Sequence, residues 1–183
     1  MIEKENILLK APEERDIKGL WYEWLNDPEV TKYQNKGFFP NTREKQKEYM
    51  QKMEESNTDV LFAIYYKERP VHVGQHIGCI GLHNIDWINK SAKIGILIGD
   101  KKYWNKGIGK LSWNMITQYG LFTLNLHRIY ADIFFKNKAS LKVAKASGYK
   151  EEGIVRDKYY KDGKYNDVVI VSVLKDEFKE VRQ

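Results

Sequence analysis

Cysteine is almost absent from this chain, and its scarcity excludes several kinds of site. Cys79 is the only cysteine among 183 residues, so neither an intrachain disulfide nor a cysteine-based zinc site can form. The four histidines are scattered, and none belongs to an HExxH motif. The sequence therefore predicts no metal centre and favours a reducing, cytoplasmic location.

Long apolar runs are also absent. No run approaches the roughly 18 residues that a transmembrane helix requires. A secretory signal peptide needs an apolar stretch near the start of the chain, but the first sixteen residues carry Glu3, Glu5, Glu13 and Glu14. We therefore expect a protein that neither spans a membrane nor is exported by that route.

The sequence contains no low-complexity tract, no obvious linker and no repeat of about 20 to 50 residues. At roughly 150 residues per domain, the length leaves room for one domain. We place it at residues 6–176, with residues 1–5 and 177–183 as terminal extensions. Hydrophobic residues make up 42% of the chain, which is enough for a packed core and argues against a disordered chain.

Positive charge is in modest excess. The chain has 31 Lys and Arg against 25 Asp and Glu, a net charge of +6, which is compatible with an anionic partner but does not identify one. Many of the lysines gather in two short segments, residues 101–110 and 136–145. A solvated helix face explains each segment as well as an anion site does.

Hydrophobic periodicity predicts a mixture of strands and helices. Strand-length runs occur at residues 7–10, 60–66, 77–82, 93–98, 128–134, 149–159 and 165–174. Helical spacing occurs at residues 16–25, 42–55, 108–119 and 137–147. Asp16 and Asn137 are the expected N-caps, Gly148 ends the last helix, and Asp162-Gly163 is a strong hairpin signal. This order predicts an α+β fold, an α/β sandwich with one mixed sheet covered on both faces.

A glycine turn, Trp-Asn-Lys-Gly-Ile-Gly-Lys at residues 104–110, precedes one expected helix. Unpaired N–H groups at a helix N-terminus favour a phosphate. A P-loop is excluded, because its first glycine would be Trp104 and its hydroxyl position is Leu111. A dinucleotide fingerprint fails at its third glycine, which is Ser112. Neither nucleoside triphosphate hydrolysis nor a Rossmann site is therefore expected.

Residues 94–109 resemble the acetyl-CoA strand and loop of the GCN5-related N-acetyltransferase (GNAT) superfamily, in the subgroup of ribosomal-protein N-terminal and amino-sugar acetyltransferases. Residues 137–140 resemble its second CoA-contacting helix, and residues 148–153 the strand that follows. Residues 25–30 resemble its helix-turn on the acceptor side. The resemblance implies a mixed central sheet of about six to seven strands, splayed in the middle, with helices on both faces.

The resemblance also implies acetyl-CoA as the co-substrate and indicates which residues contact it. Backbone groups of Ile96, Leu97 and Ile98 would pair with the pantetheine chain, with an oxyanion-type N–H donor near Ile96. The diphosphate would lie on the turn, while Asn137 and Ser140 would contact the pantetheine or thiol end. The turn residues implied in this way are Trp104, Asn105, Lys106, Gly107, Ile108, Gly109 and Lys110.

Two residues depart from the family pattern. Ala144 stands where many members have a tyrosine general acid, and Lys93 stands where relatives commonly carry a glutamate base. Ser140 is the nearest alternative acid, and a thiol with a pKa near 8.5 needs only modest help to leave. His83 and Asp86 close the preceding expected strand and are our candidates for deprotonating the amine through water.

A missing carboxylate base favours an acceptor amine of low pKa. Neutralising a lysine-like amine at pH 7 costs roughly 4.6 kcal/mol, against about 1 kcal/mol for an α-amine. We expect direct attack by a primary amine in a ternary complex, and we rank amino sugars first, protein N-termini second and polyamines third. Tyr33, Phe38 and Trp87 are candidates for an aromatic wall of the acceptor site.

Two other functions stay open. A family member that binds CoA without transferring acetyl is compatible with Lys93 and Ala144. A basic nucleic-acid-binding module would use the lysines together with interleaved aromatics such as Tyr159-Tyr160-Lys161, although no nucleic-acid-binding motif is recognised. No membrane partner is expected, and a homodimer is left open.

Overall fold

One eight-stranded sheet runs through residues 1–68 and 74–179, the part of the chain that the computed structural model describes. Its strands are β1 (Ile2–Lys4), β2 (Ile7–Lys10), β3 (Val60–Tyr66), β4 (Gln75–Asp86), β5 (Ser91–Ile98), β6 (Arg128–Phe134), β7 (Lys150–Lys161) and β8 (Lys164–Leu174). They lie in the order β1-β2-β3-β4-β5-β6-β8-β7. Only β5 and β6 pair in parallel, so the expected mixed sheet is confirmed.

The two ends of the described chain both make contacts. The sheet has one strand more than the six or seven expected. This additional strand is β1, which lies at the sheet edge and pairs with β2. Its three residues are too few to show the alternation of apolar and polar residues that indicates a strand. Near the other end Phe178 is buried and packs against the main core. Residues 180–183 of the expected C-terminal extension lie outside the described residues. The domain boundaries at residues 6 and 176 stay a prediction.

Helices cover both faces of the sheet, as expected. They are α1 (Glu14–Lys18), α2 (Trp21–Trp24), α3 (Pro28–Thr31), α4 (Arg43–Glu54), α5 (Ile108–Gln118) and α6 (Lys138–Ala146), with a 3₁₀-helix at Lys101–Tyr103 and a π-helical turn at Tyr119–Thr123. Within the described ranges, none of these helices is both long and apolar enough to cross a membrane.

The single helix expected at 16–25 is wrong, because Gly19 ends α1 and a second short helix, α2, follows. Asp16 is also not the N-cap. Glu13 takes that place, and the Asp16 carboxylate accepts the Glu13 N–H at 2.7 Å. The other Asp16 oxygen accepts from the hydroxyl of Tyr65, so a buried carboxylate links α1 to β3.

The other local signals are confirmed. The side chain of Asn137 accepts the Ser140 N–H at 3.1 Å and begins α6, and Gly148 follows this helix with φ +84°. Asp162 and Gly163 both have positive φ, which gives the two-residue hairpin that joins β7 to β8.

Alternation along β5 divides its side chains between two cores. Ile94 packs with α5 and α6 in the larger core, whereas Leu97 packs with Trp21 and Trp24 of α2 in the smaller one. Because successive residues of a strand point to opposite faces, Lys93 and Gly95 lie on the same face as Leu97. The face that carries α1 to α4 is therefore distinct from the face that carries α5 and α6.

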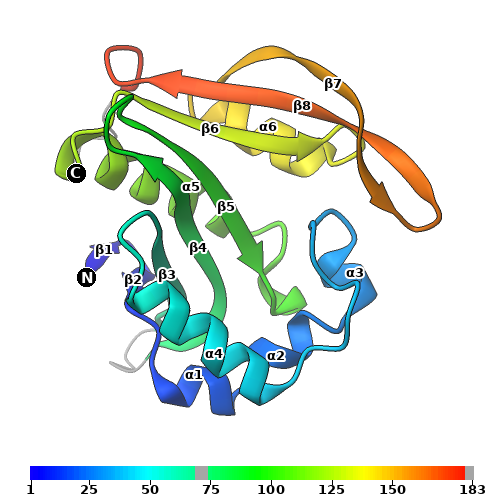
Figure 1. Ribbon diagram of the computed structural model, residues 1–183. Coiled ribbons are helices and arrows are strands. Elements are labelled where there is room, and N and C mark those ends of the chain that lie inside the picture. Colours follow the sequence, from blue (N-terminus) through cyan, green and yellow to red (C-terminus); the bar gives the residue numbers. More distant parts are fainter. Residues whose placement is uncertain (69–73, 180–183) are drawn as a thin grey trace.

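The sheet splays between β5 and β6. These strands pair only through Ser91, Ala92 and Lys93, whereas β5 pairs with β4 as far as Ile98. Figure 1 shows the two strands starting together and then diverging, β5 alongside β4 and β6 alongside β8. The expected splay is thus present, and it leaves one edge of β5 without a neighbouring strand from Ile94 onward.

Gly99 gives the first test of this packing. A Cβ built on Gly99 would lie 1.9 Å from Cδ2 of Trp24, a buried ring that holds α2 against the end of β5. We expect Gly99→Ala to lower the free energy of unfolding by about 2–3 kcal/mol through overpacking. Chemical denaturation measures this. The matched control is Gly109→Ala, where a Cβ meets nothing within 4 Å, and equal stability of the two variants would contradict the prediction.

Candidate functional site

The open edge of β5 presents backbone groups to the splay. The carbonyl of Ile96 accepts from Nε2 of Gln34 at 2.9 Å, and the carbonyl of Ile98 accepts from Nε1 of Trp104 at 2.8 Å. Both carbonyls therefore point away from β4. In an antiparallel pair, the N–H and C=O of one residue point to the same side, so the N–H of Ile96 also faces the splay.

The glycine turn forms an open helix N-terminus close to the end of β5. Gly107 is the N-cap of α5, with φ +78° and no side-chain cap. A Cβ built at Gly107 or Gly109 would meet nothing within 4 Å, so the space in front of the first N–H groups of α5 is not filled by the described residues. Lys106 and Lys110 are exposed beside it. These features fit a diphosphate, because uncapped N–H groups and the positive helix end attract anions.

The acceptor-side turn is joined to the segment before the glycine turn by ion pairs. Nζ of Lys101 lies 2.8 Å from Asp27 and 2.6 Å from Glu29. Asp27 also caps α3 by accepting the Glu29 N–H at 2.8 Å. The hydrogen bond from Lys101 holds the pKa of Asp27 below its usual value. The acceptor-side turn and the segment that leads into the glycine turn are thus in contact.

The N-terminus of α6 carries Asn137 and Ser140, the other residues expected to contact CoA. The Asn137 side chain is used as the N-cap, and Ser140 is half-buried in the first turn of α6. Ala144 is fully buried in the main core. Its methyl group provides no proton donor, so an acid for the leaving thiolate has to come from another residue or from water.

A cavity of about 170 Å³ lies on the opposite face of β5, the face that carries α1 to α4. Its lining residues are Trp21, Leu25, Gln34, Asn35, Lys36, Tyr49, Leu61, Cys79, Ile80, Gly81, His83, Gly95, Ile96 and Leu97. The imidazole of His83 lies over two glycines: a Cβ at Gly81 would be 3.1 Å from its Nε2, and one at Gly95 would be 3.5 Å from its Cδ2. His83 and Ile96 therefore line the same cavity.

His83 is paired with a carboxylate that sequence reasoning missed. Its Nδ1 lies 3.0 Å from Oδ1 of Asp59, which favours a proton on Nδ1 and leaves Nε2 free to accept one. Burial lowers the pKa of His83, and although Asp59 opposes this effect, the net pKa stays below the usual value of a histidine. The ring is therefore neutral at pH 7. Asp59 directly precedes β3, 24 residues from His83, and no local spacing links the two.

The carboxylate that the sequence suggested, Asp86, does not line this cavity. Its Oδ1 accepts the N–H groups of Ile88 and Asn89 at 2.9 and 2.8 Å, and its Oδ2 accepts from the Asn89 side chain. These bonds shape the turn between β4 and β5. They hold the pKa of Asp86 below its usual value, with the Asn89 side chain as the largest cause.

The three aromatic residues expected to form an acceptor wall are not brought together by the described contacts. Tyr33 packs against Phe134 at 6.2 Å between ring centroids, on the β6 side of the splay. Phe38 is half-exposed and lies under the ammonium of Lys161. Trp87 is exposed and donates to the carbonyl of Asn57. Tyr49 is the aromatic side chain that lines the cavity together with Trp21.

Lys93 is held in a cluster at the base of the splay. Oδ2 of Asp132 accepts from Lys93 at 2.6 Å, from Lys158 at 2.7 Å and from Tyr159 at 3.0 Å. Burial lowers the pKa of Lys93, but the hydrogen bond and charge of Asp132 outweigh it, so the net pKa lies above the usual value. Lys93 stays an ammonium at neutral pH and cannot replace a carboxylate base.

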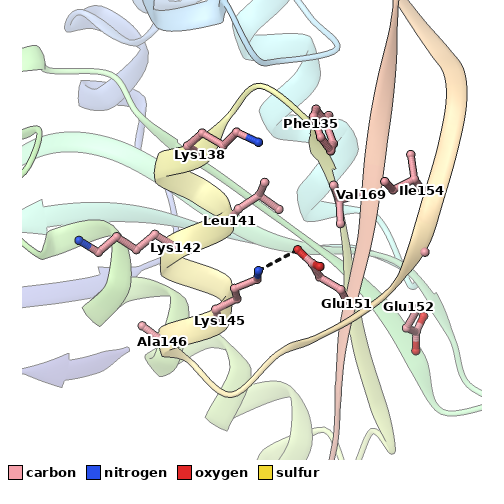
Figure 2. Close-up of a pocket in the computed structure, with 11 residues that line it drawn as sticks. Phe135, Lys138, Leu141, Lys142, Lys145, Ala146, Glu151, Glu152, Ile154 and Val169 are labelled. Carbon is pink, nitrogen blue, oxygen red and sulfur yellow. Dashed lines mark ion pairs between the residues drawn. The ribbon is translucent and has the colours of Figure 1, made fainter.

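A larger cavity, about 920 Å³, lies between α6 and strands β7 and β8 (Figure 2). It is lined by none of the site residues expected from the sequence. Lys145 is paired with Glu151 at 3.0 Å across it, and its floor includes Leu141 and Val169. Across the described ranges, no group of three or more His, Cys, Asp or Glu side chains is placed to hold a metal ion.

Comparison with known proteins matches this geometry to one family. The model of the acetyltransferase (GNAT) domain matches residues 6–150. The uncharacterized N-acetyltransferase p20 of Bacillus licheniformis is 31% identical over 177 residues, covering 95% of this chain and 96% of that protein. The spermidine N(1)-acetyltransferase of Vibrio cholerae is 28% identical over 102 residues, covering 56% and 58%.

A crystal structure of spermidine N-acetyltransferase from Vibrio cholerae in complex with CoA and spermine has the same fold. It superposes with a TM-score of 0.84 at 23% identity and covers 94% of this chain and 97% of that one. The ordered motifs of the sequence, the splayed sheet and these matches agree. The chain belongs to the GNAT family of N-acetyltransferases, which use acetyl-CoA.

Proposed function

We propose that this chain transfers an acetyl group from acetyl-CoA to a primary amine by direct attack in a ternary complex. The observation that supports this most is the position of Ile96. Its outward-facing backbone lies on the strand that leads to the open glycine turn, and it also borders the cavity that holds His83. A thioester and an amine approaching from these two sides would meet at one backbone position.

On the donor side, the Ile96 N–H would stabilise negative charge developing on the thioester oxygen, an interaction worth a few kcal/mol. The neighbouring backbone of Leu97 and Ile98 would hold the pantetheine chain. Asn137 and Ser140 are proposed for its thiol end, with the Ser140 hydroxyl assisting the leaving group. The diphosphate would be held by Trp104, Asn105, Lys106, Gly107, Ile108, Gly109 and Lys110.

On the acceptor side, His83 is the proposed base and Asp59 the residue that orients it. The amine nitrogen attacks the thioester carbon, so that a C–N bond forms and the C–S bond breaks. The amine proton passes to Nε2 of His83, directly or through one water, and the thiolate leaves and is protonated. Asp86, the other candidate from the sequence, would act only through water from outside the cavity.

The acceptor is proposed to be a small amine such as an amino sugar, or else a protein N-terminus. Both have amines of lower pKa than a lysine side chain, so a neutral imidazole of modest basicity suffices. Tyr33, Phe38 and Trp87 stay proposed as contacts for larger acceptors outside the cavity. A cytoplasmic location and a homodimer also stay predictions.

Gly109 tests the donor site. We expect Gly109→Leu to weaken acetyl-CoA binding at least tenfold, because the added side chain fills the space in front of α5, while the melting temperature stays within about 2 °C. Calorimetric titration measures the affinity. Ala11→Leu adds comparable bulk at an exposed position that lines neither cavity and serves as the control. Unchanged affinity of Gly109→Leu would place the cofactor elsewhere.

His83 and Asp59 test the acceptor chemistry. We expect His83→Gln to lower kcat about 100-fold. In the unaltered protein we expect the rate to hold at neutral pH. On acidification it should fall at a pH below the usual pKa of a histidine, because His83 is protonated there and no longer acts as a base. Asp59→Asn should shift that fall to still lower pH, because Asp59 raises the pKa of His83. Asp86→Asn should change the rate less than twofold, and the reverse ranking of the two aspartates would refute the assignment.

The two alternatives give different outcomes in the same assays. A chain that binds acetyl-CoA but releases no thiol with any amine of a broad panel would be a CoA-binding member without transferase activity. Salt-dependent binding of a short RNA in the absence of acetyl-CoA binding would support the nucleic-acid-binding module.

A further inference from the structure

The cavity that contains His83, here called the acceptor cavity, has a charge that limits which substrates it can bind. Its lining contains one ionised side chain, Lys36, and no carboxylate among the described residues. Asp59, a carboxylate that contacts the lining residue His83, is engaged by Ser56 Oγ at 2.8 Å, by His83 Nδ1 at 3.0 Å and by the Asn84 N–H at 3.4 Å. Asp132 is engaged by two lysines and a tyrosine. Neither is left to hold a substrate ammonium.

Lys36 is fixed in place at both ends. Its carbonyl accepts from Nζ of Lys161 at 2.6 Å, and Lys161 is itself 7% exposed. Its ammonium lies 4.6 Å from the ring centroid of Tyr49, another cavity residue. Lys36 as a whole is exposed, but its backbone is held by a residue 125 positions along the chain and its ammonium lies against the Tyr49 ring, so this cationic lining residue has a defined position.

The field of Lys36 reaches the interior of the cavity. It lowers the pKa of both His83 and Cys79, although burial is the larger influence on each of these groups. Burial raises the pKa of Tyr49, so its hydroxyl stays protonated and can donate a hydrogen bond. A cation and a hydroxyl donor on one wall favour an anionic ligand group and disfavour a second ammonium.

We infer that the amine acceptor carries an anionic group, such as a phosphate or a carboxylate, that pairs with Lys36 while its amine faces His83. This inference rests on the proposed acetyl transfer and narrows its acceptor. A polyamine would place an ammonium beside Lys36, and no carboxylate among the described residues lines the cavity to compensate. By this criterion polyamines are the poorest acceptors, even though spermine is bound in the solved spermidine N-acetyltransferase structure.

The test compares acceptors that share one amine and differ only in the anion. Glucosamine 6-phosphate is paired with glucosamine, and the C-terminally amidated dipeptide Ala-Asp-NH₂ with Ala-Asn-NH₂, with spermidine as the cationic probe. For the pair whose amine the protein acetylates, we expect kcat/KM to be at least tenfold higher for the anionic member than for the neutral one. Spermidine should give the lowest value. The preference should decrease with added salt.

Lys36→Gln keeps the backbone carbonyl that holds Lys161 and removes only the charge. It should bring the ratio of kcat/KM for the anionic and the neutral acceptor close to one. Lys47→Gln, on an exposed position of α4, is the matched control and should leave the ratio unchanged. Equal use of both members by the unaltered protein, a preference for spermidine, or a ratio unaffected by Lys36→Gln would overturn the inference while leaving acetyl transfer intact. Acetylation of no amine would instead refute the proposed function, and the inference with it.

Discussion

The parallel pairing of β5 with β6 ends after three residues, and the rest of the candidate site depends on this. A strand that keeps β4 on one side and loses its neighbour on the other exposes a row of backbone N–H and C=O groups. Two of the carbonyls are satisfied by Gln34 and Trp104, which leaves the Ile96 N–H directed into the splay. A ligand with amide and carbonyl groups along its length, such as pantetheine, can satisfy an open strand edge without any particular side chain.

The alternation of side chains along β5 then separates the two substrates. Even-numbered residues such as Ile94 face α5 and α6, and odd-numbered residues such as Lys93 and Leu97 face α1 to α4. The glycine turn begins α5, whereas His83 and Lys36 lie on the other face. One strand can thus hold the acyl donor along its edge and present an amine cavity on one face. In the proposed function, acetyl transfer takes place where these two meet.

Local signals in the sequence predicted much of the fold and the open glycine turn to which the proposed function assigns the donor. Asn137, Asp162-Gly163 and the glycine turn act through their own backbone, and their structures follow from short spacings. The acceptor half depends on contacts that no spacing encodes. Asp59 meets His83 across β3 and β4, and Lys161 reaches Lys36 from the far hairpin. Asp86 has a suitable residue type at a suitable place in the chain, but its carboxylate is used by a turn. The helical spacing of apolar residues continues past Gly19, so the sequence pattern does not show that α1 ends there and that α2 is a separate helix.

A crystal structure of the unaltered chain with acetyl-CoA tests the central claim most directly, because the claim concerns one backbone group. We expect the thioester oxygen to lie within about 3 Å of the Ile96 nitrogen and the diphosphate to lie on the first N–H groups of α5. Acetyl-CoA bound in the cavity between α6 and β7, or an Ile96 N–H bonded to protein instead of to the thioester, would contradict it.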